Sequence, residues 1–105
     1  MEKLSTKEDL QKVISENDGI TVVKFYADWC GPCKTLGKII EEGNFEGAKF
    51  YEVDVDEADC DFIDEFKIRN IPVLVFFKNG VQVDKTVGTM SKSDLENKIN
   101  DIKSK

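Results

Sequence analysis

The sequence predicts an α/β fold, with a central mixed sheet of four to five strands flanked by four helices. Apolar residues recur at helical spacing in four segments, and segments rich in β-branched and aromatic residues lie between them. The strand–helix–strand units are long enough for right-handed crossovers, which place parallel strands in one sheet with helices on both faces. The last two strands are joined by a tight turn and must be antiparallel, so the sheet is mixed.

The helices are delimited by capping and glycine signals. Ser5 and Glu8 have the spacing of a capping box, which predicts the start of the first helix. Gly19 and Gly43 each follow an amphipathic stretch and predict where a helix has ended. The four predicted helices lie between Ser5 and Asp18, from Cys33 to Glu42, around the stripe Phe62, Ile63 and Phe66, and from Ser91 to Ile102.

The strands differ in their expected burial. Ile20–Tyr26 is almost wholly apolar, which is typical of a strand covered on both faces. Residues 49–55 alternate between apolar and polar side chains, with Phe50 as the one residue out of step. The other predicted strands are Glu2–Leu4, Val73–Phe77 and Val81–Val87, and the turn Lys78-Asn79-Gly80 joins the last two.

The length and charge of the chain exclude several classes of function. At 105 residues we expect one domain, residues 1–105, and a monomer. The net charge of −6 argues against binding nucleic acid or an anionic membrane surface. The longest apolar run, Ile71–Phe77, is too short to span a bilayer. Since no secretory leader opens the sequence, we expect a cytoplasmic protein.

The cysteine and histidine counts restrict the chemistry. Without histidine, the chain has no Ser-His or Cys-His nucleophile pair and no imidazole ligand for a metal. A structural zinc site usually takes four ligands and the chain has three cysteines, so no metal site is expected. Three thiolates completed by a carboxylate remain an alternative. Cys60 stands apart from the other two, and we expect a structural or half-exposed cysteine there, with regulatory oxidation as the alternative.

The pair Cys30 and Cys33 lies where a buried strand gives way to a helix. Pro32 suits the first turn of that helix, because its missing N–H is not needed there. Cys30 is expected at the helix N-terminus, where free N–H groups favour a thiolate, with the Cα of Cys33 about 5–6 Å away, within disulfide range. We therefore predict that Cys30 is the exposed attacking thiol and Cys33 the shielded resolving one. Two structural cysteines that happen to be close are the alternative.

The segment Phe25–Lys34, FYADWCGPCK, resembles the active-site signature of the thioredoxin family. The stretches Ile68–Pro72, Phe77–Gly80 and Val87-Gly88 follow in the order and spacing of that family, so the resemblance covers nearly the whole chain. It implies the thioredoxin fold and a thiol–disulfide oxidoreductase that reduces the disulfides of client proteins.

The resemblance also implies how electrons reach the site. The Cys30–Cys33 disulfide is itself the redox group, with no bound cofactor, and a thioredoxin reductase drawing on NADPH regenerates the dithiol. Two alternatives stay open: a binding module with this fold but no turnover, and an oxidant or isomerase of an oxidising compartment. The Gly31-Pro32 dipeptide between the cysteines, in place of a histidine-containing one, argues against the second.

A client-binding surface around Cys30 is a further implication of the resemblance. Pro72 is expected to follow a cis peptide bond. An extended client peptide is expected to pair with the backbone of Ile71 and Thr89. Gly88 is expected to leave room for this peptide. The apolar surface is expected to consist of Trp29, Gly31, Pro32, Ile71, Pro72, Val87 and Gly88.

Two charged positions depart from the family pattern, besides the smaller departures of Val73 from threonine and of Asn70 from glycine. Lys24 stands where most thioredoxins carry a buried aspartate, and Glu52 stands where a lysine partner is frequent. Because an unpaired buried charge is strongly destabilising, we predict that Lys24 and Glu52 form the same pair with the charges exchanged. An ammonium cannot accept a proton but favours a nearby thiolate, so we expect the proton of Cys33 to leave through Glu52 or water. The alternative is that Lys24 extends into solvent and Glu52 is an ordinary surface acid.

Overall fold

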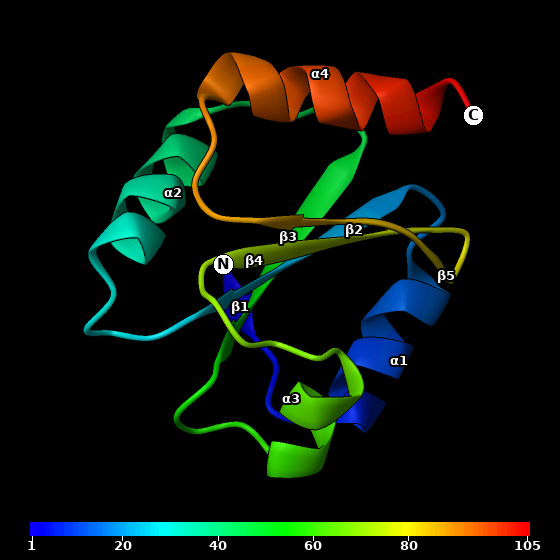
Figure 1. Cartoon of the computed structure of the whole chain (residues 1–105). Coiled ribbons are helices and arrows are strands. Elements are labelled where there is room, and N and C mark those ends of the chain that lie inside the picture. The colour runs from blue at the N-terminus through cyan, green and yellow to red at the C-terminus, as the bar shows by residue number, and fades with distance from the viewer.

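The computed structural model describes all 105 residues and contains a five-stranded mixed sheet with four helices, as predicted. Helices α2 and α4 cover one face of the sheet, and α1 and α3 cover the other (Figure 1). None of these helices is long and apolar enough to cross a membrane. In chain order the elements are β1 (Glu2–Lys3), α1 (Lys7–Glu16), β2 (Ile20–Tyr26), α2 (Gly31–Glu42), β3 (Ala48–Asp54), α3 (Cys60–Glu65), β4 (Val73–Lys78), β5 (Val81–Val87) and α4 (Lys92–Lys103).

The strand order β1-β3-β2-β4-β5 places β2 in the centre of the sheet. β2 runs parallel to β3 and antiparallel to β4, and its register sets Lys24 directly beside Glu52. The β4–β5 hairpin turns at Asn79 and Gly80, both with positive φ (54° and 79°), as a tight two-residue turn requires. The carboxyl end of β2 thus leads into α2 from the middle of the sheet, where neighbouring strands support it.

Both faces of the sheet are buried, and this corrects the expectation for Phe50. Phe50 packs against the core beneath α2 and α4, whereas Tyr51 packs against the core beneath α1 and α3. Because helices cover each face, an apolar side chain such as Phe50 can be buried on the same face of β3 as Glu52 and Asp54. Phe50 therefore follows the alternation of side-chain directions along β3. It is apolar where the sequence pattern suggested a polar residue because the second face of the sheet is also buried.

The first helix is capped by Thr6 and not by Ser5. The Thr6 hydroxyl accepts the Asp9 N–H at 3.1 Å, and the Asp9 carboxylate accepts the N–H groups of Thr6 and Ser5 at 3.1 and 3.0 Å. These two N–H groups lower the pKa of Asp9. The predicted box of Ser5 with Glu8 is wrong by one residue, because the neighbouring Thr6 and Asp9 have the same spacing.

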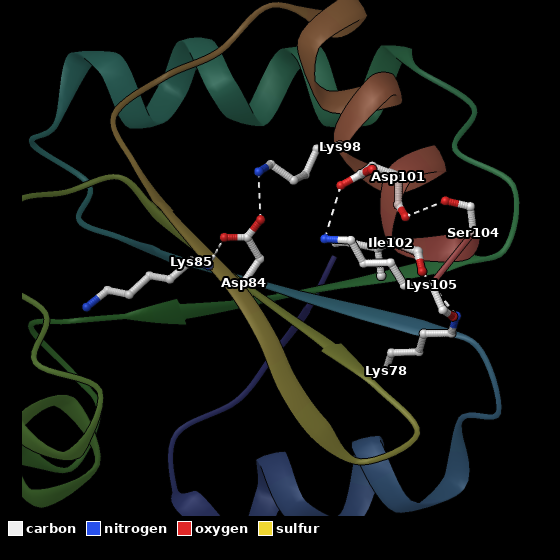
Figure 2. A network of polar contacts seen from close by, with 8 residues as sticks. All are labelled: Lys78, Asp84, Lys85, Lys98, Asp101, Ile102, Ser104 and Lys105. Atoms are coloured by element: carbon white, nitrogen blue, oxygen red, sulfur yellow. Dashed lines mark hydrogen bonds and ion pairs between the residues drawn. The ribbon is translucent and has the colours of Figure 1, made fainter.

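The end of α4 is attached to the sheet by a lysine from β4 (Figure 2). The ammonium of Lys78 donates to three main-chain carbonyl groups, those of Ile102, Lys103 and Lys105, at 3.0, 3.3 and 2.6 Å. These acceptors lie at the C-terminal end of the helix, where carbonyl groups lack helical partners and a cation is favourable. Near the middle of α4, Lys98 donates to Asp84 of β5 at 2.6 Å and lowers the pKa of that carboxyl group.

Candidate active site

Cys30 is the N-cap residue of α2. The strand β2 ends at Tyr26, and the Cys30 N–H donates to the carbonyl oxygen of Ala27 at 3.1 Å, which turns the chain into the helix. The Sγ atom of Cys30 accepts the N–H of Cys33 at 3.2 Å, and Pro32 lies in the first helical turn. Cys30 therefore lies at the N-terminus of α2, and the N–H of Cys33 points at its Sγ atom. This N–H favours a negative charge on the sulfur.

Cys30 and Cys33 form a disulfide, with their Cα atoms 5.3 Å apart as the helical spacing predicted. Both are buried, since Cys30 is 5% exposed and Cys33 is 1% exposed. Cys30 is thus much less exposed than expected, because it packs in a cluster with Tyr26 and Ala27 and lies 3.9 Å from the carbonyl oxygen of Ile71. The order of exposure between the two cysteines is nevertheless the predicted one.

The residues expected around Cys30 differ widely in exposure. Trp29 and Val87 are the large apolar side chains that solvent reaches, at 73% and 61% exposure. Gly31, Pro32 and Thr89 are exposed, Ile71 and Gly88 are half-buried, and Pro72 is buried. The disulfide is therefore buried, whereas Trp29 and Val87, two of the apolar residues expected around it, are exposed.

The Ile71–Pro72 peptide bond is cis, as the resemblance implied. The Gly88 N–H donates to the carbonyl oxygen of Pro72 at 2.8 Å, which brings the end of β5 to the start of β4. Gly88 has φ of +91°, and a Cβ there would meet no atom within 4 Å. Within this chain, its backbone conformation and not a lack of space is what favours glycine.

Trp29 is held by an acidic residue that the sequence did not single out. Its indole Nε1–H donates to the Asp56 carboxylate at 2.9 Å, and the Asp56 N–H in turn donates to Asp54 at 2.9 Å. Asp54 is 4% exposed. The acidic stretch after β3 was visible in the sequence, but nothing in it placed Asp56 opposite an indole 27 residues away.

Lys24 and Glu52 lie side by side on β2 and β3, with Nζ and Oε2 separated by 3.7 Å. The Lys24 side chain is 6% exposed and that of Glu52 is 19% exposed. The Lys24 ammonium also lies 5.0 Å from the centroid of the Tyr26 ring. Lys24 therefore does not extend into solvent, and burial raises the pKa of the neighbouring Tyr26.

A cleft of about 210 Å³ connects Lys24 with Cys33, and Gly37 also lines it. A Cβ atom at Gly37 would lie 2.9 Å from Nζ of Lys24, so the ammonium reaches α2 one turn beyond Cys33. Gly37 was missed by the sequence reasoning, because a glycine inside a helix carries no sign of what approaches it.

The third cysteine and the acidic groups lie outside this arrangement. Cys60 is a free, exposed cysteine at the start of α3. No three cysteine or carboxylate side chains come close enough together to hold a metal ion.

The thioredoxin family model matches residues 2–101 of the chain. The chain belongs to the thioredoxin family. A thioredoxin of Mycoplasmoides gallisepticum is 41% identical over 98 residues, covering 91% of this chain and 96% of the relative. Thioredoxin-2 of Saccharomyces cerevisiae is 34% identical over 88 residues, covering 82% and 84%.

The fold agrees with solved thioredoxin structures. The thioredoxin of Fasciola hepatica gives a TM-score of 0.86 at 32% identity, covering 96% of this chain and 98% of the other. A mutant thioredoxin of Halobacterium salinarum gives 0.85 at 33% identity, covering 95% and 88%. The architecture is a thioredoxin fold, and with the Cys30–Cys33 disulfide the protein is a thiol–disulfide oxidoreductase. Thioredoxins act on disulfide-containing clients and are served by reductases.

Proposed function

We propose that Cys30 is the nucleophile and Cys33 the resolving thiol in the reduction of client disulfides. The Cys30 thiolate attacks one sulfur of the client disulfide, forms a mixed disulfide and releases the other client sulfur as a thiolate. The Cys33 thiolate then attacks Sγ of Cys30, forms the Cys30–Cys33 disulfide and releases the second client thiolate. Two electrons pass to the client, and the two client thiolates take up the protons that the cysteines gave up.

The observation that carries this order is the hydrogen bond from the Cys33 N–H to the Cys30 sulfur at 3.2 Å. In the reduced protein that donor lowers the free energy of a Cys30 thiolate, whereas Cys33 has no such N–H directed at its own sulfur. Cys33 is also the more deeply buried of the two. A client disulfide therefore meets Cys30 first.

The client-binding surface of the proposal is formed by the apolar residues expected around the disulfide. The exposed side chains of Trp29 and Val87 supply apolar contact area. The backbone groups of Ile71 and Thr89 are proposed to pair with an extended client segment on either side of Cys30. This surface is completed by residues without bulky polar groups, namely Gly31, Pro32, Pro72 and Gly88.

Lys24 and Glu52 are proposed to assist the resolving step. Lys24 and Cys33 line the same cleft, and the positive charge of the Lys24 ammonium favours the Cys33 thiolate. It cannot accept a proton, so the proton of Cys33 passes to Glu52 or to water. Glu52, paired with Lys24, keeps the net charge beside the site close to zero.

The wider setting of the reaction is also part of the proposal. A reductase drawing on NADPH returns the disulfide to the dithiol, and no further cofactor is bound. Residues 1–105 act as a single-domain monomer in the cytoplasm, where thiols are kept reduced. The net charge of −6 supports the expectation that neither nucleic acid nor anionic lipid is a partner.

The proposed roles can be tested by trapping the intermediate. The Cys33→Ser variant is expected to accumulate a mixed disulfide between Cys30 and a client such as insulin, detected by intact mass. The Cys30→Ser variant is expected to form none. Cys60→Ser, which removes an exposed cysteine outside the site, is the matched control and should reduce insulin at the wild-type rate. A client adduct on Cys33 in the Cys30→Ser variant, formed as fast as the other, would reverse the assignment.

A further inference from the structure

The Lys24 ammonium has no hydrogen-bond partner within the protein, although its side chain is only 6% exposed. The Glu52 carboxylate lies at 3.7 Å, which is close enough for an ion pair but beyond hydrogen-bond range. The Tyr26 ring lies 5.0 Å away and offers only its π face. An ammonium carries three N–H donors, and because the protein supplies no acceptor for them, they are left to the solvent or to a ligand in the cleft.

The ammonium of Lys24 faces the cleft beneath α2. The cleft has a volume of about 210 Å³ and is open to solvent, with Lys24, Cys33 and Gly37 in its lining. The backbone of α2 lies close to the ammonium at Gly37, because a Cβ atom at this position would lie 2.9 Å from Nζ of Lys24. The volume is large enough for several water molecules or for one small oxyanion.

The charged side chains that line the cleft are of both signs, and the buried one among them is a cation. Lys34 and Lys38 extend from α2 into its lining and join the buried Lys24, against the two acids Asp28 and Glu41. Glu52 pairs with Lys24 but does not line the cleft. Among these five lining groups, the one that is buried and lacks a hydrogen-bond acceptor is a cation. A ligand with negatively charged oxygen atoms would supply what Lys24 lacks.

We propose that this cleft binds a small oxyanion, a phosphate or a carboxylate, with Lys24 as its principal partner and Glu52 as its competitor. The site is separate from the client-binding surface, since it lies beside Cys33 and beneath α2. Binding requires no part of the proposed redox mechanism. The effect of binding on the redox site does rest on that mechanism, because a negative charge beside Cys33 would counter the stabilisation of the Cys33 thiolate by Lys24.

The test is a titration of the oxidised protein with inorganic phosphate and, in a separate arm, with acetate. Ionic strength and pH are held constant with chloride, and the amide signals of Cys33 and Gly37 are followed by NMR. Saturable shifts with either anion are the expected result, and the two arms identify which oxyanion the cleft prefers. The absence of saturation in both arms would mean that the cleft holds only water and would overturn the proposal.

Two substitutions in the pair should act in opposite directions. Lys24→Met, which keeps an unbranched side chain without the charge, is expected to abolish the saturable shifts. Glu52→Gln removes the competitor and is expected to tighten binding several-fold, and it retains Lys24 even if the first variant folds poorly. Lys12→Met, at an exposed lysine on α1, is the matched control and should change nothing. Shifts that persist in Lys24→Met, or no tightening in Glu52→Gln, would contradict the proposed site.

Discussion

The ammonium of Lys24 lies 3.7 Å from the carboxylate of Glu52, on the strand beside it and beneath the helix that begins at the disulfide. Most thioredoxins carry an aspartate at the first of these positions, and many carry a lysine at the second. Here the charges are exchanged while the pair itself is kept. The buried charge that shares a cleft with Cys33 therefore has the opposite sign to the one the family pattern implies, and a partner of opposite sign still accompanies it.

This pair should behave as a unit when its members are changed. Lys24→Asp and Glu52→Lys each bring two like charges together in a largely buried place, and each should lower the free energy of unfolding by about 2–4 kcal/mol. The double exchange should recover part of the loss, with a coupling of at least about 1 kcal/mol. Urea denaturation of the four proteins measures this, together with the rate of disulfide reduction. If the two losses simply add, the residues are not coupled.

Client binding can be separated from stability with two valines on β5. Val87 and Val81 are 61% and 62% exposed, but only Val87 lies at the end of the strand beside Pro72. Val87→Ser should lower kcat/KM for insulin reduction roughly fivefold, corresponding to about 1 kcal/mol of lost apolar contact. Both variants should keep their stability within about 0.5 kcal/mol. Equal kinetic effects from Val87→Ser and Val81→Ser would place the client-binding surface elsewhere.

The capping residue of α1 offers a sharp test of the fold. Thr6→Ala removes the side-chain acceptor of the Asp9 N–H and should lower the free energy of unfolding by about 1 kcal/mol. Ser5→Ala is the matched control, because the hydrogen bonds of Ser5 are made by its backbone and survive the change, and its effect should stay within about 0.5 kcal/mol. Thermal or urea unfolding distinguishes the two, and a larger loss in Ser5→Ala would show that the cap has been assigned to the wrong residue.

The ion pair between Asp84 and Lys98 should make stability depend on pH. The hydrogen bond from Lys98 and the N–H of Lys85 lower the pKa of Asp84 below its ordinary value of 3.8. A lowered pKa means that the carboxylate stabilises the fold above the unfolded-state value, and that this contribution disappears as the pH falls through the folded-state value.

Asp84→Asn should therefore be less stable than wild type at pH 7, by about 1 kcal/mol for this partly exposed pair. Below pH 3.8 the difference in the free energy of unfolding between the variant and wild type should narrow progressively. Unfolding by urea at neutral and acid pH measures the difference between the two proteins. A gap that stays constant down to the lowest pH would show that the ionised carboxylate is not its source.

Several elements could be predicted because their sequence signals are local. The bounds of β2 agree with the prediction residue for residue. An apolar run predicts a strand buried on both faces without any information on the strands beside it. The hairpin around Asn79 and Gly80 was also predicted, except that β4 extends to Lys78, which the prediction had placed in the turn. The capping box was misplaced by one residue, because Ser5 and Thr6 are equivalent in spacing and only the backbone geometry distinguishes them.

Other features depend on contacts between distant segments. The burial of Lys24 follows from α2 passing over β2, and its contact with Glu52 follows from the register of two neighbouring strands. The depth of Cys30 was misjudged, because the Ile71 segment that covers it comes from elsewhere in the chain. The hydrogen bond between Trp29 and Asp56 has the same origin. Periodicity and spacing along one segment carry no information on such contacts.

The most direct test of the redox assignment is an equilibrium titration of the Cys30–Cys33 couple in glutathione buffers, with the thiol content read by alkylation and mass. Thioredoxins that act as reductants have potentials near about −270 mV, and we expect a single two-electron transition close to that value. Cys60 should be alkylated at every potential. A midpoint above about −200 mV would mean that the protein oxidises or isomerises disulfides instead of reducing them, and would contradict the function proposed here.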